Sequence, residues 1–246
     1  MDHSLYVAMT GATQIMRAQE AVSHNLANAS TTGFRAELTA FQSLPVQGPG
    51  EATRINAVAH GVGVDTTPGA ITTTGRSLDV AVQGSGWIAV QAPDGSEGYT
   101  RAGDLQLTAD GLLTDAAGHP VLGNGGPISL PPSAQLRIGE DGTISSVPIG
   151  EGPATVAALD RIRLVNPPPA QLVQGGDGLM HLAGGGTATP DTTVRVTAGA
   201  LESSNVDASS ELVKMIALSR QYDMQIKSIK AAEDNASSAS KLLQSN

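Results

Sequence analysis

The distribution of proline divides this chain into three parts. All 14 prolines lie between Pro45 and Pro190, so the first 44 and the last 56 residues contain none. Only three of the 29 glycines fall outside the same window. Proline removes a backbone donor and glycine costs about 1 kcal/mol in a helix interior, so long helices are favourable only at the two ends. The pattern predicts two helical ends that pair with each other and a glycine-rich body between them.

The N-terminal part repeats apolar and small residues at heptad spacing from Leu5 to Asn28. A stripe this narrow is typical of a coiled-coil seam rather than of a broad core-facing surface. Asn28 is expected to end the helix in the left-handed conformation. The two columns of the predicted stripe are Leu5, Ala12, Gln19 and Leu26, and Met9, Met16, Val22 and Ala29.

The C-terminal part repeats the pattern over about 35 residues, which would make a helix of about 55 Å. Asn205 or Asp207 is the predicted cap. The lysines of the chain all lie on this helix, as on a solvated face. Its main column is Met215, Tyr222, Ile229, Ala236 and Leu243, and the adjoining column is Leu212, Ser219 and Ile226.

The middle of the chain changes from helical to strand periodicity. Leu78, Val80 and Val82 alternate with less apolar neighbours, and Asp-Gly and Asn-Gly pairs separate the short apolar runs that follow. Such pairs supply the positive φ angles that tight hairpins require, so an antiparallel β domain is predicted. The fold class is therefore α+β. The expected segments are 1–34 (helix and turn), 35–75 (extended connector), 76–190 (β domain), 191–205 (return strand) and 206–246 (helix).

Charge and composition exclude several classes of protein. Residues 61–200 hold 13 Asp and Glu against 6 Arg and no Lys, and this acidic balance argues against a nucleic-acid partner. The absence of cysteine excludes disulfides and thiolate sites. No apolar run approaches the ~18 residues of a membrane span, and the N-terminus does not have the pattern of a cleaved signal peptide. We therefore expect neither nucleic-acid binding nor membrane insertion.

No arrangement of residues indicates catalysis, a metal site or a cofactor. The five histidines are scattered, with no second ligand at helical spacing. Gly84-Ser85-Gly86 lacks the flanking glycine pattern of a nucleophile elbow, and Gly184-Gly185-Gly186 lacks the lysine and helix of a phosphate-binding loop. The sequence thus predicts a protein that is not an enzyme.

Two motifs flank the predicted helices. The first helix runs into Asn25-Leu26-Ala27-Asn28-Ala29-Ser30-Thr31-Thr32-Gly33-Phe34, and Gly199-Ala200-Leu201-Glu202-Ser203-Ser204-Asn205-Val206 precedes the second. We call them the N-terminal motif and the C-terminal motif. They resemble the two terminal motifs of the flagellar rod and hook family. The resemblance extends to Leu78–Trp87, where Trp replaces the commoner Phe, and to Tyr99–Gly103.

Further segments refine the resemblance. Arg220-Gln221-Tyr222-Asp223-Met224 is similar to the C-terminal helix of the family, with Asp at 223 where Glu is more familiar. Leu164–Pro167 and Gly176–Leu179 are most like those of proximal rod members, and distal rod members come second. The resemblance covers nearly the whole chain.

The resemblance implies a structural subunit of the bacterial flagellar basal body, located in the rod that spans the periplasm. Its partners would be other copies of itself, neighbouring rod proteins and the flagellar type III export apparatus, which needs no cleaved signal. The terminal helices would line the tube and build the axial shaft and export channel. The residues expected to pack between subunits are Leu5, Met9, Leu26, Asn28, Gly33, Phe34, Leu201, Asn205, Leu212, Met215, Tyr222, Ile226 and Ile229.

Three alternatives stay open. The helix columns could form a coiled-coil core within one subunit, and both roles could exist on different faces. A secreted β-rich adhesin with a helical stalk is a second possibility, although Trp87 and Tyr99 are the only aromatic residues of the body that could stack on a sugar. An enzyme acting on the cell wall is a weaker third, because no catalytic carboxylate pair is visible.

Overall fold

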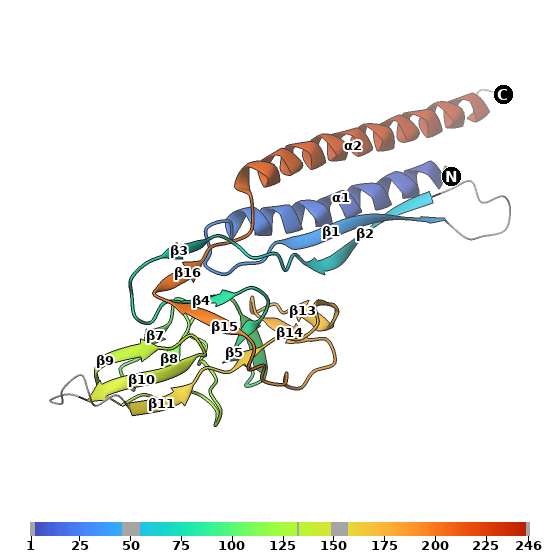
Figure 1. Cartoon of the computed structure of the whole chain (residues 1–246). Coiled ribbons are helices and arrows are strands. Elements are labelled where there is room, and N and C mark those ends of the chain that lie inside the picture. Colours follow the sequence, from blue (N-terminus) through green and yellow to red (C-terminus); the bar gives the residue numbers. More distant parts are fainter. Residues whose placement is uncertain (1–2, 46–54, 132, 149–156, 245–246) are drawn as a thin grey trace. The chain divides into compact units, whose positions relative to one another are not determined.

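The computed structural model describes residues 3–45, 55–131, 133–148 and 157–244. The chain divides into two compact units (Figure 1). Unit 1 comprises residues 1–27, 37–62 and 207–246, and unit 2 comprises residues 28–36 and 63–206. Unit 1 holds the two terminal helices and unit 2 holds antiparallel strands, so the α+β class predicted from the sequence is confirmed.

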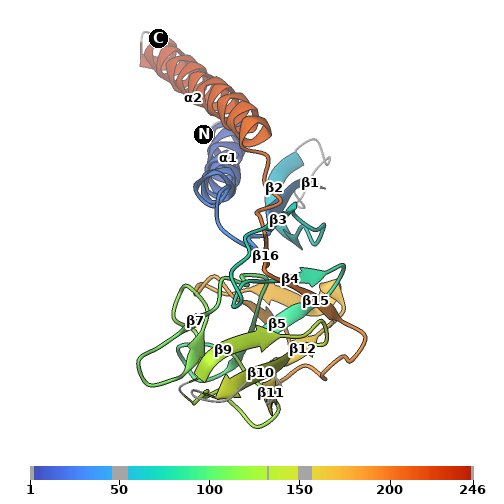
Figure 2. The same ribbon diagram turned by 60° about the vertical axis from the view of Figure 1, so that its left-hand side comes forward.

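Unit 1 is built on a pair of helices. Helix α1 (His3–Ala27) and helix α2 (Ala208–Gln244) lie side by side and run in opposite directions (Figures 1 and 2). Strands β1 (Glu37–Pro45) and β2 (Ile55–Val64) pair in the part of the chain expected as a connector. Among the described residues, neither helix is long and apolar enough to cross a membrane.

The contact between the helices uses small residues of α1. Ile15, Ala18 and Val22 are buried against Leu218, and Met215 and Tyr222 of α2 pack beside them. Ala8 and Ala12 continue the buried face of α1. Small side chains let helix backbones approach closely, which draws the contact toward the alanine-rich side of α1.

The predicted stripes therefore differ from the buried faces. In the predicted second column of α1, Val22 is buried but Met9 and Met16 are about half exposed. In α2, Met215 and Tyr222 of the main column do face α1. Leu212 and Ile226 of the adjoining column are exposed, because Leu218 takes the position between Met215 and Tyr222.

The structure shows which of the predicted caps form at the end of α1 and at the start of α2. Asp207 caps α2, since its Oδ1 accepts a hydrogen bond from the Ser209 amide at 3.0 Å. Asn28 is not left-handed, because every positive φ angle among the described residues belongs to glycine. Instead, the chain after α1 turns through a hydrogen bond from the Thr31 amide to the Asn28 carbonyl at 3.0 Å.

Unit 2 contains short strands and one 3₁₀ turn. Its elements are β3 (Ile71–Thr73), β4 (Val80–Gln83), β5 (Trp87–Gln91), β6 (Glu97–Thr100), β7 (Gln106–Leu107), β8 (Leu113–Thr114), β9 (Ser133–Ile138), β10 (Thr143–Pro148), β11 (Ala157–Arg161), β12 (Leu164–Val165), η1 (Pro169–Gln171), β13 (Leu172–Gln174), β14 (Met180–Leu182), β15 (Arg195–Ala198) and β16 (Ala200–Glu202).

These strands form antiparallel sheets. Within the described part of the chain, the largest sheet has the order β12-β5-β6-β14-β13, and a three-stranded sheet has the order β11-β10-β9. The pairs β15-β4, β16-β3 and β7-β8 complete the unit. Strands β4 and β15 pair from Ala198 opposite Val80 to Arg195 opposite Gln83. The C-terminal return of the chain therefore lies against the start of the β body.

The core of unit 2 is aliphatic, as the scarcity of aromatic residues predicts. Val80, Val82, Ile88, Val90 and Leu105 are members of its main cluster, and none is more than marginally exposed. A second cluster contains Trp87 and Tyr99. The predicted alternation in β4 is incomplete, because Asp79 and Ala81 are buried as well.

The turns follow the predicted chemistry at four of the five pairs. Gly95, Gly111, Gly142 and Gly178, each preceded by Asp, have φ angles between 81° and 86°. After Asn124 the positive φ occurs one residue later than expected, at Gly126. A single glycine after a carboxylate therefore suffices to reverse the chain in most of these turns.

Candidate functional site

The two terminal motifs come together inside unit 2. The Gly33 amide donates a 2.8 Å hydrogen bond to the Glu202 carbonyl, and the Asn205 amide donates one of 3.3 Å to the Phe34 carbonyl. Leu201 pairs with Thr72, because β16 runs antiparallel to β3. We call this contact of residues 28–36, 63–75, 101–103 and 199–206 the junction.

Gly33 sits where no other residue fits. Its φ angle is +67°, in the left-handed region. A Cβ at this position would lie 2.2 Å from the carbonyl carbon of Arg101 and 2.4 Å from the Ala102 amide nitrogen. Both neighbours are backbone, which moves little. The glycine of the N-terminal motif thus permits the close approach of two chain segments.

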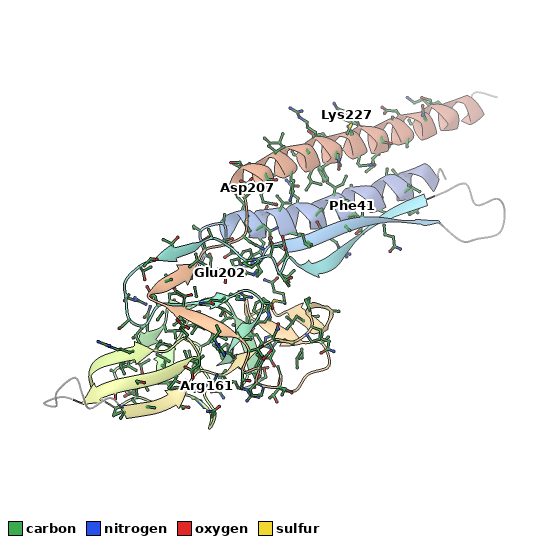
Figure 3. All side chains as sticks on the ribbon, in the orientation of Figure 1. Phe41, Arg161, Glu202, Asp207 and Lys227 are labelled. Atoms are coloured by element: carbon green, nitrogen blue, oxygen red, sulfur yellow. The ribbon has the colours of Figure 1, made fainter. Side chains whose placement is uncertain are left out.

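Glu202 is the centre of the junction (Figure 3). Its Oε1 accepts hydrogen bonds from Arg35 Nη2 at 2.5 Å and from the Gly69 amide at 2.9 Å. Its Oε2 accepts one from Arg101 Nη1 at 3.0 Å. The three charged side chains are between 0% and 3% exposed. A carboxylate buried this deeply is stable only with such complete pairing.

Arg101 is anchored on its other side by the β body. Its Nη2 donates a 2.6 Å hydrogen bond to the Gly84 carbonyl, and its guanidinium carbon lies 5.4 Å from the centre of the Trp87 ring. Burial lowers the pKa of the Arg101 guanidinium, and the Glu202 carboxylate opposes that shift. Two guanidinium groups therefore share one carboxylate, and removal of that carboxylate would leave two buried cations unneutralised.

Asn205 makes a second set of contacts with its side-chain amide. Its Oδ1 accepts a 2.8 Å hydrogen bond from the Ala36 amide. Its Nδ2 donates to the carbonyls of Asp65 and Thr67, each at 3.0 Å. The Asp65 amide in turn donates to the Ala36 carbonyl at 2.8 Å. One asparagine thus joins three backbone segments that are distant in sequence.

Asn25, at the other end of the N-terminal motif, acts in the same way within unit 1. It is buried, its Nδ2 donates to the Glu37 carbonyl at 3.0 Å, and its Oδ1 accepts from the Glu37 amide at 2.8 Å. His24 Nδ1 also lies 2.7 Å from the Glu37 carboxylate. The start of β1 is thereby fixed to the end of α1.

The structure separates the predicted packing residues into two groups. Gly33, Phe34, Leu201 and Asn205 lie in the junction, where Asn28 forms its first turn. The others lie on the helices of unit 1: Leu5, Met9, Leu26, Leu212, Met215, Tyr222, Ile226 and Ile229.

Sequence reasoning did not find the charged cluster. Arg35 lies one residue beyond the N-terminal motif, Glu202 lies within the C-terminal motif, and Arg101 lies within residues 99–103. Their separations of 167 and 101 residues leave no spacing to recognise. The available signal was a single charged residue in the C-terminal motif, Glu202, and an arginine directly after the N-terminal motif.

Two histidines outside the junction form local pairs with aspartates. His119 lies 2.9 Å from Asp115, and His181 lies 3.0 Å from Asp177, and in both pairs the partners are four residues apart. Among the residues that the structure describes, no group of three or more His, Asp or Glu side chains is placed to hold a metal ion.

Comparison with known protein families identifies the class of this molecule. Residues 5–35 match the family of flagella basal body rod proteins, and residues 197–242 match the C-terminal region of the flagellar basal body rod FlgEFG proteins. Residues 81–146 match the D1 domain of flagellar hook proteins FlgE/F/G. Each matched region contributes one member of the charged cluster: Arg35, Arg101 and Glu202.

Full-length relatives agree with this assignment, and the chain belongs to the flagellar basal-body rod protein family. It is 45% identical to the flagellar basal-body rod protein FlgF of Escherichia coli and 43% identical to that of Salmonella typhimurium, with 99% of both chains covered in each comparison. The rod protein FlgG of Agrobacterium fabrum is 34% identical, over 98% of this chain and 99% of that protein.

Proposed function

We propose that this chain is a structural subunit of the proximal part of the flagellar rod. The observation that carries the proposal is the full-length similarity to the FlgF proteins of Escherichia coli and Salmonella typhimurium, at 45% and 43% identity. Its role is structural rather than enzymatic, in keeping with this family. Its place is the basal body, where it forms part of the axial shaft and of the channel within it.

Assembly proceeds through the terminal helices. α2 exposes Leu212, Val213, Ile216 and Met224, and α1 exposes Met9, although both helices already contact each other on their opposite faces. Large exposed apolar patches mark interaction surfaces. The helices thus have two roles: their inner faces hold unit 1 together, and their outer faces contact other copies of the chain and neighbouring rod proteins.

The junction supports assembly by fixing where each helix joins the rest of the chain. The Glu202 cluster and Asn205 hold the segments that follow α1 and precede α2. A segment fixed in this way loses less conformational freedom when a helix docks, so more of the contact energy remains as affinity.

Export precedes assembly in this proposal. The chain leaves the cell through the flagellar type III apparatus without a cleaved signal peptide and folds at the growing rod. The cysteine-free composition means that its folding there does not depend on disulfide formation.

Deletion of the gene, followed by electron microscopy of isolated basal bodies, tests the proposal. We expect basal bodies that end below the distal rod, with no hook, and full recovery when the gene is restored on a plasmid. Complete rods in the deletion strain would overturn the proposal. Loss of only the distal segment would favour a distal rod subunit instead.

A further inference from the structure

Unit 1 contains a groove between the end of α1, the start of β1 and the first turns of α2. Its volume is about 260 Å³, and its lining is mainly apolar. Ala18, Ala21 and Val22 form one wall, Leu38 and Phe41 a second, and Ala217 and Leu218 part of a third. Leu38 and Phe41 remain 43% and 48% exposed. The groove has room for one or two apolar side chains.

One polar group in this groove has unused hydrogen-bonding capacity. The Glu211 side chain lines the groove and is only 7% exposed. Its Oε1 accepts a 2.6 Å hydrogen bond from Lys214, whereas its Oε2 is buried without a hydrogen-bond partner among the described residues. A buried carboxylate oxygen is costly unless a donor reaches it, and a cation is the strongest such donor. The groove therefore suits an apolar side chain that stands beside an Arg or Lys.

The outer face of α1 has this chemistry. Tyr6, Met9 and Met16 are 58%, 51% and 49% exposed. Arg17 is also exposed, and no ion pair is formed by it within the described part of the chain. Steps of three, seven and one residue place these four side chains within about 100° of one another on a helix. Met16 and Arg17 thus present an apolar side chain and a cation together.

We propose that the groove of one copy receives the outer face of α1 from a second copy, with Met16 inserted between Phe41 and Leu218 and Arg17 bound to Glu211. The proposal rests on the proposed function and names the contact that the rod subunits make. A straight helix cannot fold residues 9–17 onto a groove lined by its own residues 18–25, so the occupant is another molecule. A contact in which one face of a subunit binds a different face of the next subunit is heterologous, and such contacts build rings or open helical filaments.

Cysteine cross-linking tests the contact directly, because the native chain has no cysteine. Met16→Cys is placed in one copy of the gene and Phe41→Cys in a tagged second copy, and both are expressed in a strain that lacks the native gene. Oxidation of isolated basal bodies should join the two chains. The matched control replaces Met16→Cys by Val173→Cys, which is exposed on unit 2, and should give a several-fold lower yield.

Charge reversal tests the ion pair. Arg17→Glu, an exposed position that leaves the fold intact, should lower the cross-linked fraction about tenfold or more. Arg17→Glu combined with Glu211→Arg should restore most of it, whereas Arg195→Glu should have no effect. Circular dichroism of each purified variant is the control that checks whether the helices are retained.

The cross-linking experiment distinguishes failure of this inference from failure of the proposed function. Basal bodies that contain both chains but give no cross-link above the control would overturn the inference alone. A cross-link from Phe41→Cys to a protein of different mass would assign the groove to a neighbouring rod protein and overturn the second copy as occupant. Basal bodies without the chain would contradict the proposed function itself.

Discussion

Arg35 and Glu202 are separated by 167 residues, yet their side chains form an ion pair of 2.5 Å in which neither partner is more than 3% exposed. The pair joins the segment that leaves α1 to the strand that leads into α2. Because Arg101 binds the second oxygen of the same carboxylate, the β body takes part in this connection. The residue that follows the N-terminal motif, the C-terminal motif and the β body are thus connected through one carboxylate.

Loss of this carboxylate should be severely destabilising. Glu202→Gln leaves Arg35 and Arg101 buried with no counter-charge, and breaking a buried pair in this way costs about 3–5 kcal/mol. Urea unfolding of the purified chain, followed by Trp87 fluorescence, measures the change. Arg161→Met is the matched control, because Arg161 and its partner Asp141 are partly exposed and such pairs contribute about 0–1 kcal/mol. Equal midpoints for the two variants would contradict the assigned role of Glu202.

Substitution of Gly33 should also destabilise unit 2. Gly33→Ala places a Cβ against the Arg101 backbone and forces a left-handed conformation that alone costs about 1–3 kcal/mol. Gly125→Ala is the control, since Gly125 has open space around it and no positive φ. Thermal unfolding should show a drop of several degrees for the first variant only. A Gly33→Ala protein as stable as Gly125→Ala would mean that the two segments do not approach closely.

The stability of unit 2 should fall when the side-chain hydrogen bonds of Asn205 are removed. It should also fall when the Nδ2 donor is replaced by an acceptor. Asn205→Asp replaces the Nδ2 donor by an oxygen that faces the carbonyls of Asp65 and Thr67. Repulsion between these acceptors should make Asp more damaging than Ala, although Asp is closer to Asn in shape. The free energies of unfolding of the two variants decide the point. The reverse order would show that the carbonyl contacts contribute little.

The stability of unit 2 should fall at strongly alkaline pH because of Tyr99. Burial raises the pKa of Tyr99 to about 12 from 10. Between these values the folded chain holds a proton that the unfolded chain has lost, so stability decreases as the pH rises above about 10. Tyr99→Phe removes this dependence. Denaturant unfolding from pH 9 to pH 11.5 should therefore show a steeper loss for the native chain than for the variant.

Local chemistry was enough to predict much of the fold. Proline-free ends indicated both helices, and Asp-Gly pairs indicated turns that the glycine φ angles confirm. Heptad counting was less reliable for the helix contact. Heptad spacing placed both Ala12 and Met9 in the predicted stripe. Because the helices approach closely, the small side chain of Ala12 is buried and the large side chain of Met9 is exposed.

Only part of the candidate site could be predicted from the sequence. Gly33 and Asn205 belong to motifs whose resemblance could be recognised along the chain. The pairing of Glu202 with Arg35 and Arg101 depends on long-range folding, and nothing in the local sequence marks an arginine as buried. Asp79 is a different case, because its hydrogen-bond donors Arg76 and Thr74 are close in sequence, whereas its position in the alternation next to Val80 indicated an exposed side chain.

The central claim is that the outer faces of the helices, not their inner faces, join this subunit to the rod. Two matched variants of α2 separate these roles. Leu218→Asp places a charge in the contact with α1 and should reduce the helical circular dichroism signal, whereas Ile216→Asp lies on the exposed outer face and should leave that signal unchanged.

Electron microscopy of basal bodies from a strain in which the Ile216→Asp variant replaces the native chain is the most direct test. The account predicts that the variant is exported and keeps its helices, but that the rod stops at the segment this chain should form. Complete rods and normal swimming with Ile216→Asp would contradict the account.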